Sequence, residues 1–301
     1  MTVNSLQQPV DASMHFLQRS SKYDTEKPYS LRFPAPEGLA HSNVLSEEHQ
    51  IQVESMRDRD DLTLETSSFE LMPFKSPLSY EDFESKEKIE QGLLPALCQR
   101  LKSHLNAEHV IALDHSVRRR HKSFPISTGK DYDYDQPTAM AHVDFTVEES
   151  EKMLRIMYPE FAEDIIKGGY KIINAWRPLR GPLNDWPLAI CDARTVDNEA
   201  DLMPGDIVYP DWATENLQVH HNPNHKWYYL PDQTADEVLI FKSADSSPQK
   251  SQAVPHGSFN NPRVGKDEPL RESIDMRFFV FFAPLNEYPS NPGNIFSRRP
   301  H

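Results

Sequence analysis

The sequence has little that would cross-link the chain or anchor it in a membrane. Only two of its 301 residues are cysteines, Cys98 and Cys191, and their wide separation argues against a disulfide framework and a thiolate zinc site. No apolar run approaches the roughly 20 residues that a membrane-spanning helix needs. The first residues also lack the cationic start and apolar core of a signal peptide. We therefore expect a cytoplasmic protein.

Positive charge is also scarce. Lysine and arginine number 32 against 46 acidic residues, which gives a formal net charge of −14. Binding to nucleic acid or to an anionic membrane surface needs clustered cations, so neither partner is expected. Glycine-rich nucleotide loops and internal repeats are absent as well. The expected partner is a small-molecule substrate, and the sequence leaves open whether the chain forms a homodimer.

The chain reads as one domain with an N-terminal extension. Residues 1–90 are rich in serine, proline and charge and are interpreted as an arm packed on the core, which spans residues 91–301. An amphipathic helix is predicted over 85–105 from leucines at helical spacing, whose stripe we expect to pack on the core. A second helix is predicted over 146–168, with Thr146 as its N-cap.

Most of the remaining core has the pattern of short strands. One is predicted at His109–Leu113, and seven more follow Gly169, separated by turn residues, at 170–176, 188–192, 206–209, 226–230, 237–242, 253–259 and 273–282. Many short strands at such spacing favour a sandwich or jelly roll over a parallel sheet. The predicted fold class is mainly β with flanking helices.

A metal-binding set is suggested by His142-Val143-Asp144 together with the distant His256. Residues at i and i+2 of a strand share a face, so His142 and Asp144 can point into one barrel mouth. His256 begins another predicted strand, which a jelly roll can return to the same place. Two imidazoles and one carboxylate are the ligand set of non-haem Fe(II), leaving three positions for a 2-oxo acid and dioxygen. A second cluster, at His220, His221 and His225, competes for the third ligand position.

His256 is preferred as third ligand because an Arg-x-Ser sequence, Arg271 and Ser273, follows it closely. On the predicted strand these two residues share a face with Asp275 and Arg277. A guanidinium can bind a carboxylate through two hydrogen bonds, and a hydroxyl completes the site. Arg271 and Ser273 are therefore the first choice for holding the distal carboxylate of a 2-oxo acid, with Arg277 as the rival. The alternative for Arg277 is an internal ion pair with Asp275 or Glu272.

A long polar and aromatic segment, 116–137, leads into the His142 strand and is interpreted as a lid over the metal. Its Phe124, Tyr132 and Tyr134 are candidates for substrate contact, against the alternative of an exposed loop. The arginines of 118–120 are interpreted as a solvated run. Asn174 and Trp176 share a strand face and are expected to line the pocket, although ordinary packing would also explain Trp176.

Several segments together resemble the fungal hydroxylase/desaturase family of secondary metabolism, which is similar to cephalosporin methoxylase components and to meroterpenoid endoperoxide-forming oxygenases. The resemblance covers roughly residues 90–285 and rests on the segments 174–182, 186–192, 222–229, 236–242, 255–259 and 271–277. It implies a double-stranded β-helix (jelly roll, cupin-like), with Fe(II) on His142, Asp144 and His256 and 2-oxoglutarate on the Arg-x-Ser strand. The chain departs from the family pattern at Pro255–Phe259, where Gly-Ser stands in place of the expected Thr-Ala.

The predicted function is an Fe(II)/2-oxoglutarate-dependent dioxygenase. The resemblance implies an apolar, meroterpenoid-like intermediate as substrate. It also implies an iron-centred oxidant that abstracts hydrogen and leads to hydroxylation, desaturation, rearrangement or endoperoxide formation. Two alternatives remain at this stage. One is a cupin-like metal enzyme that does not use 2-oxoglutarate, and the other is an auxiliary ligand-binding subunit.

Overall fold

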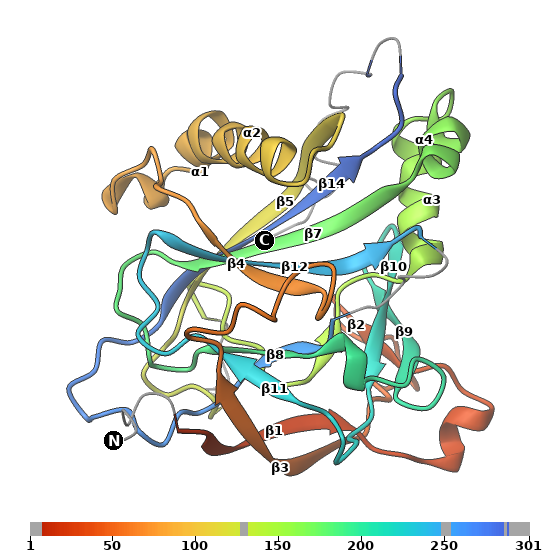
Figure 1. The fold of residues 1–301 in the computed structure, drawn as a ribbon. Coiled ribbons are helices and arrows are strands. Elements are labelled where there is room, and N and C mark those ends of the chain that lie inside the picture. The colour runs from red at the N-terminus through yellow and green to blue at the C-terminus, as the bar shows by residue number, and fades with distance from the viewer. Residues whose placement is uncertain (1–7, 127–131, 248–253, 286–287, 289–301) are drawn as a thin grey trace.

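A computed structural model describes residues 8–126, 132–247, 254–285 and 288. Two sheets face each other in it (Figure 1). The smaller sheet has five strands, each antiparallel to its neighbours. In spatial order they are β4 (Phe69–Pro73), β12 (Glu237–Asp245), β7 (Tyr170–Pro178), β14 (Glu272–Phe281) and β5 (His109–Arg119).

The larger sheet has nine strands and joins segments that lie far apart in the sequence. In spatial order they are β1 (Val10–Leu17), β3 (Ser46–Ser55), β11 (Trp227–Tyr229), β8 (Leu188–Cys191), β13 (His256–Ser258), β6 (His142–Val143), β10 (Ala213–Val219), β9 (Leu202–Val208) and β2 (Tyr29–Leu31). All neighbours are antiparallel except β3 with β11 and β2 with β9. The predicted jelly roll is confirmed.

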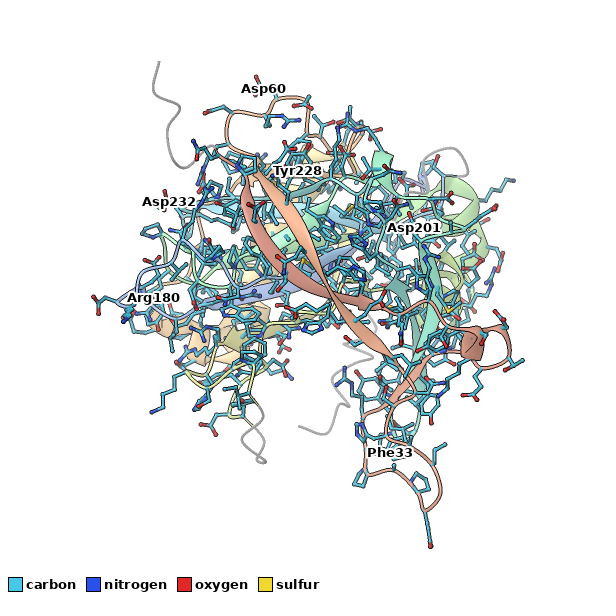
Figure 2. The ribbon with its side chains drawn as sticks, turned by 90° about the horizontal axis from the view of Figure 1, so that it is seen from below. Phe33, Asp60, Arg180, Asp201, Tyr228 and Asp232 are labelled. Carbon is cyan, nitrogen blue, oxygen red and sulfur yellow. The ribbon has the colours of Figure 1, made fainter. Side chains whose placement is uncertain are left out.

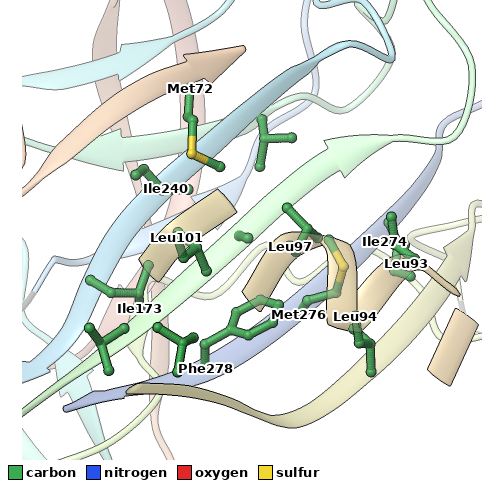
Figure 3. Packing of buried hydrophobic residues seen from close by; sticks show 14 of the residues in the cluster. Met72, Leu93, Leu94, Leu97, Leu101, Ile173, Ile240, Ile274, Met276 and Phe278 are labelled. Carbon is green, nitrogen blue, oxygen red and sulfur yellow. The ribbon is translucent and has the colours of Figure 1, made fainter. Parts of the chain in front are cut away.

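The predicted leucine-rich helix covers the outer face of the five-stranded sheet (Figures 1 and 3). It comprises α1 (Lys86–Lys88), a π-helical stretch (Ile89–Leu93) and α2 (Leu94–His104). Elsewhere in the described residues, short 3-10 helices lie at Ser21–Asp24, Glu81–Glu84 and Ala193–Thr195. Leu97 and Leu101 are fully buried and pack with Met276 and Phe278 of β14. The leucine stripe is thus core, as predicted, and burying such side chains stabilises the helix on the sheet.

The second predicted helix is in fact two helices, α3 (Val147–Met157) and α4 (Ala162–Gly168). Thr146 caps α3 as predicted, because its side chain accepts a hydrogen bond of 3.0 Å from the backbone N–H of Glu149. Pro159 stands between the helices, and proline cannot continue a helix that would need its N–H. The two helices lie at one end of the molecule (Figure 1).

The described part of residues 1–90 supplies strands to both sheets. β1 pairs with β3 over eight residues, and β3 runs parallel to β11, so the N-terminal ribbon continues the nine-stranded sheet. β4 forms an edge of the other sheet beside β12. Figure 2 shows β1 and β3 crossing one face of the molecule, and Phe33 on a loop that extends away from the body.

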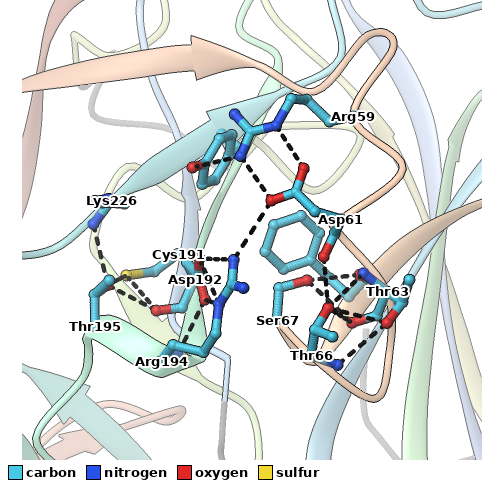
Figure 4. Close-up of polar contacts among 12 residues, drawn as sticks. Arg59, Asp61, Thr63, Thr66, Ser67, Cys191, Asp192, Arg194, Thr195 and Lys226 are labelled. Atoms are coloured by element: carbon cyan, nitrogen blue, oxygen red, sulfur yellow. Dashed lines mark hydrogen bonds and ion pairs between the residues drawn. The ribbon is translucent and has the colours of Figure 1, made fainter.

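A polar network fastens the loop after β3 to the end of β8 (Figure 4). Asp192 accepts hydrogen bonds from the guanidinium of Arg194, which lies 3.9 Å from Asp61. Arg59 donates to the same Asp61 carboxylate at 2.7 Å.

Within the described ranges, no helix is both long and apolar enough to span a membrane.

Candidate active site

A cavity of about 100 Å³ lies between the two sheets. Its lining comes from β5, β7, β12 and β14 on one side and from β6, β8 and β13 on the other. The segment that precedes β6 adds Asp135 and Thr138. Seven of the eleven candidate residues line this cavity, namely His142, Asp144, Asn174, Trp176, His256, Arg271 and Arg277. An eighth, Ser273, accepts a hydrogen bond from Arg271.

The structure brings together the His142, Asp144 and His256 side chains. His142 and His256 are directly opposite in the antiparallel pair β6–β13, and Asp144 follows β6 by one residue. The Nε2 atoms of His142 and His256 lie 3.7 and 3.8 Å from the two carboxylate oxygens of Asp144. Among the described residues this is the one group of three or more potential metal-binding side chains whose ligand atoms lie within 4.8 Å of one another.

Both histidines are oriented by the same kind of backbone contact. The Nδ1–H of His142 donates to the carbonyl of Met140 at 2.8 Å, and that of His256 donates to Val254 at 3.1 Å. This arrangement places the proton on Nδ1 and leaves each Nε2 lone pair directed toward Asp144. Burial, together with the nearby His142, lowers the pKa of His256 to about 4, so its imidazole is neutral near pH 7. Two imidazoles and one carboxylate fit a divalent non-haem iron.

The carboxylate of Asp144 is kept ionised by its surroundings. Burial raises the pKa of Asp144, but Arg277 and the two histidines outweigh it, so the net pKa lies well below the usual range. The Nη1 atom of Arg277 is 3.6 Å from Asp144 Oδ1. Asn174 donates a hydrogen bond from Nδ2 to Asp144 Oδ2. The expected pocket position of Asn174 is therefore observed, and its side-chain amide contacts the carboxylate.

Arg271 is a buried cation at the other end of the cavity, with 2% of its surface exposed. Its Nη1 donates to the Ser258 hydroxyl at 2.6 Å and to the Trp186 carbonyl at 2.7 Å, and its Nε donates to the Ser273 hydroxyl at 3.0 Å. In the described part of the chain, no carboxylate forms an ion pair with this guanidinium. Burial and the nearby Arg118 lower the pKa of Arg271 to about 9, as expected for a cation without a direct counter-ion.

Arg277, the second candidate for the carboxylate site, already forms ion pairs with acidic side chains. Its Nε donates to Asp114 Oδ1 at 2.6 Å, its Nη2 bonds the other oxygen of Asp114, and its Nη1 faces Asp144. The internal ion pair considered from the sequence therefore exists, but the predicted partners were wrong. Asp275 pairs with Arg118, and Glu272 lies 3.1 Å from Arg180.

The three arginines interpreted as a solvated run are all partly buried and form ion pairs, and Arg119 pairs with Glu84. Arg118 lies on β5 and lines the cavity. It donates three hydrogen bonds of 2.8 to 3.1 Å from Nε and Nη2 to Asp275, and one of 2.8 Å from Nη1 to the Gln136 carbonyl. Arg120 pairs with Asp185 at 2.6 Å. The signal that the sequence offered was alternation, since Asp114, Ser116 and Arg118 share one face of a strand. The prediction ended this strand at Leu113 and missed that face.

The proposed substrate aromatics lie outside the cavity lining. Phe124 packs edge-on against Trp186 at 4.8 Å, and the Tyr132 hydroxyl donates to the Ile126 carbonyl at 2.7 Å. Tyr134 bonds Glu84 at 3.0 Å and stacks under Arg119. Part of the predicted lid, residues 127–131, falls outside the described residues, so contact of these aromatics with a substrate stays a prediction.

The competing histidine cluster makes other contacts. His220 bonds the Leu17 carbonyl at 2.8 Å, and His225 bonds Asp201 at 3.0 Å. His221 stacks on His49 with ring centres 4.0 Å apart. None of the three lines the cavity, so His256 is the histidine that joins His142 and Asp144.

Comparisons with known proteins agree with this geometry. A family model described as "Oxidoreductase/YMDC permease-like domain" matches residues 14–281. The chain is 30% identical to the Fe(II)/2-oxoglutarate-dependent dioxygenase nvfI of Aspergillus novofumigatus, over 90% of this chain and 96% of that protein. It is 26% identical to the hydroxylase/desaturase poxK of Penicillium oxalicum, over 86% and 88%.

A solved structure shares the whole fold. The iron and alpha-ketoglutarate-dependent endoperoxidase NvfI superimposes with a TM-score of 0.80 at 27% identity, covering 92% of this chain and 99% of that one. A variant of the same enzyme gives a TM-score of 0.82 at 28% identity, with 93% and 99% covered.

Proposed function

Because the chain belongs to the Fe(II)/2-oxoglutarate-dependent dioxygenases of fungal secondary metabolism, we propose that His142, Asp144 and His256 bind its Fe(II). The enzyme class brings Fe(II), 2-oxoglutarate and dioxygen as cofactor and co-substrates, and a small molecule as substrate. The observation that carries the assignment is a three-residue donor set and an unpaired buried arginine in one cavity.

Arg271 and Ser273 are the proposed site for the distal carboxylate of 2-oxoglutarate. The Arg271 guanidinium is buried, is held on one side by Ser258, Trp186 and Ser273, and has no carboxylate partner among the described residues. A buried cation of this kind is stabilised strongly by an incoming carboxylate. Arg277 is a poorer candidate because its guanidinium already faces Asp114 and Asp144.

The chain's own residues would bind the metal, orient its ligand side chains and shield the cavity from water. When bound, the iron with its co-substrates supplies the oxidising chemistry that removes hydrogen from a carbon of the substrate. Met140 and Val254 fix the two imidazole rings through their carbonyls, so the ligand atoms are in place before the metal arrives. Trp176, Leu188 and Phe241 give the cavity an apolar wall that excludes water.

The proposal for the substrate names a class of compound, whereas the proposal for the cofactors names the molecules. We propose a small-molecule intermediate of fungal secondary metabolism that meets the cavity beside Asp135 and Thr138, with Phe124, Tyr132 and Tyr134 as further candidate contacts. Hydroxylation, desaturation, rearrangement and endoperoxide formation share the hydrogen abstraction, so the ligand set is compatible with each. The cytoplasmic location stays a prediction.

An anaerobic titration tests the metal and co-substrate sites. Apo-protein receives Fe(II) and then 2-oxoglutarate while the weak visible charge-transfer band of the chelate is followed. The band is expected in the wild type, lost in His256→Ala, and shifted to higher 2-oxoglutarate concentration in Arg271→Ala. Arg180→Ala is the control, because Arg180 has an exposed side chain paired with Glu272 and should behave as wild type.

The alternatives predict other outcomes. Iron binding by the wild type without any band would overturn the 2-oxoglutarate site and favour the cupin-like metal enzyme. Equal bands in wild type and Arg271→Ala would move the carboxylate site away from Arg271. No metal binding at all would leave the auxiliary-subunit reading.

A further inference from the structure

A row of four polar side chains crosses the five-stranded sheet beside Asp144. Asp114 of β5 is directly opposite Arg277 of β14, and Arg277 is directly opposite Asn174 of β7. Ser243 of β12 completes the row by donating a hydrogen bond of 2.7 Å from its hydroxyl to Asn174 Oδ1. Asp114, Asn174 and Ser243 are at most 6% exposed.

β-Bulges shape both ends of this row. On β12 the register against β7 shifts between Lys242 and Ala244, which makes Ser243 the extra residue. On β5 the register against β14 shifts beside Asp114 in the same way. A bulge turns a side chain that regular alternation would send to the other face. The chain therefore carries two local distortions, each next to a residue of the row.

The hydrogen bonds along the row have a fixed direction. The Ser243 hydroxyl donates to the Asn174 carbonyl oxygen, and the Asn174 amide therefore presents its Nδ2–H to Asp144 Oδ2. Without Ser243 the amide could turn over and bring its oxygen toward the carboxylate, which would be repulsive. Arg277, held by Asp114, faces the other oxygen, Oδ1.

We propose that Asn174 is a positioning residue for the iron site, and that Ser243 orients it. The pair holds the Asp144 carboxylate in one rotamer, with Oδ2 engaged by Asn174, so that the carboxylate is oriented before a metal would bind. The proposal rests on the assignment of Fe(II) to Asp144 above. It reassigns Asn174 from the substrate wall, where the sequence placed it, to the support of a metal ligand.

Cobalt(II) is the probe for the test, because it does not require anaerobic handling and its visible d–d spectrum reports the coordination geometry. The full chain is titrated with Co(II) in the absence of 2-oxoglutarate. Asn174→Ala is expected to weaken Co(II) binding by about 10- to 100-fold, the usual effect of removing a partner of a metal ligand. Its d–d spectrum should also change, because a freed carboxylate can bind through both oxygens.

Ser243 supplies a second, milder pair of variants. Ser243→Ala is expected to weaken Co(II) binding by about two- to tenfold, as for the loss of one neutral hydrogen bond. Ser243→Thr keeps the hydroxyl and should restore wild-type affinity and spectrum. In the double variant with Asn174→Ala, removing Ser243 as well should add nothing, because its effect passes through Asn174. The matched control is Ser67→Ala, which removes another buried hydroxyl bonded to the Thr63 and Phe69 carbonyls.

The outcomes separate this inference from the proposed function. If wild type binds Co(II) no better than His256→Ala, the metal assignment fails. If wild type binds and Asn174→Ala binds equally with an unchanged spectrum, the positioning role is overturned while the metal site stands. An equal loss in Ser67→Ala would also overturn it, by showing general destabilisation. If Asn174→Ala does not fold, the Ser243→Ala and Ser243→Thr pair decides, and wild-type behaviour in both rejects the proposal.

Discussion

The guanidinium of Arg271 lies 5.0 Å from the centre of the Trp176 ring, and both residues line the cavity. The pair joins a residue that precedes β14 to one on the neighbouring strand β7. An aromatic face stabilises a cation that has lost its water, so Trp176 holds Arg271 in place without neutralising it. The positive charge remains available to a bound anion.

Replacing Trp176 by leucine should therefore weaken 2-oxoglutarate binding. A cation–π contact contributes about 0.5–2 kcal/mol, so we expect an affinity loss of about two- to 30-fold. Trp176→Phe should retain most of the affinity because it keeps an aromatic face. The measurement is the charge-transfer titration with 2-oxoglutarate, with Trp212→Leu outside the cavity as control. Equal affinity in Trp176→Leu and wild type would contradict the role.

Ser258 is predicted to tune the same site. Its hydroxyl accepts a 2.6 Å hydrogen bond from Arg271. Ser258→Ala should lower 2-oxoglutarate affinity by about tenfold, since one hydrogen bond to a charged group contributes about 1.5 kcal/mol. Metal affinity measured without 2-oxoglutarate should not change. A loss confined to metal affinity would show that Ser258 acts on His256 instead.

Gly257 and Met14 form a coupled pair beside the metal site. A Cβ added at Gly257 would lie 2.6 Å from Met14 Cε, so the methionine occupies the space that a side chain at position 257 would need. Gly257→Thr should destabilise the protein by about 1 kcal/mol, the low end of an overpacking penalty, because the atom that must move is the end of a flexible side chain. Chemical denaturation of Gly257→Thr, Met14→Ala and the double variant checks this. The double variant should be more stable than the sum of the two single effects predicts, and simple additivity would refute the coupling.

Stability should fall as the pH drops from 7 to 5. Burial lowers the pKa of His109, His115, His220, His221 and His225 below the ordinary 6.5. The unfolded chain then takes up protons that the folded chain does not, so the stability present above pH 6.5 is lost on acidification. Each such histidine contributes at most about 1.4 kcal/mol per pH unit.

His221→Phe tests this dependence. Phenylalanine keeps the aromatic contacts with His49 and Phe16 but cannot titrate. Urea denaturation at pH 7 and pH 5 should show a smaller loss of stability in the variant than in wild type. An identical loss in both proteins would exclude His221 from the pH dependence.

The sequence predicted the parts of the fold that repeat a simple pattern. The leucine spacing located the helical segment on the sheet, and alternation found the polar face of β14. A strand without such a pattern was missed. Ala213–Val219 of β10 was not predicted, because Glu215, Asn216 and Gln218 interrupt any apolar alternation. The split between α3 and α4 was missed although Pro159 signalled it.

The site contacts that the sequence did not predict join residues that lie far apart in the chain. The convergence of His142, Asp144 and His256 was predictable from the residue types and from the jelly-roll topology, which brings distant strands together. The partners of Arg277 were not, because Asp114 lies 163 residues away and reaches it through a bulge. Nothing in a single sequence marks Ser243 as the extra residue of a bulge, so its contact with Asn174 needed the structure.

The place of β14 in the five-stranded sheet determines when that sheet can form during protein synthesis. It is the last strand among the described residues, yet it lies between β5 and β7, which do not pair with each other. Until residues 272–281 leave the ribosome, β5 and β7 have no common neighbour and their apolar faces stay exposed. Contacts between such distant segments also make folding slow. A chain that lacks β14 therefore leaves these faces uncovered, and truncation before β14 is expected to give aggregation rather than a smaller domain.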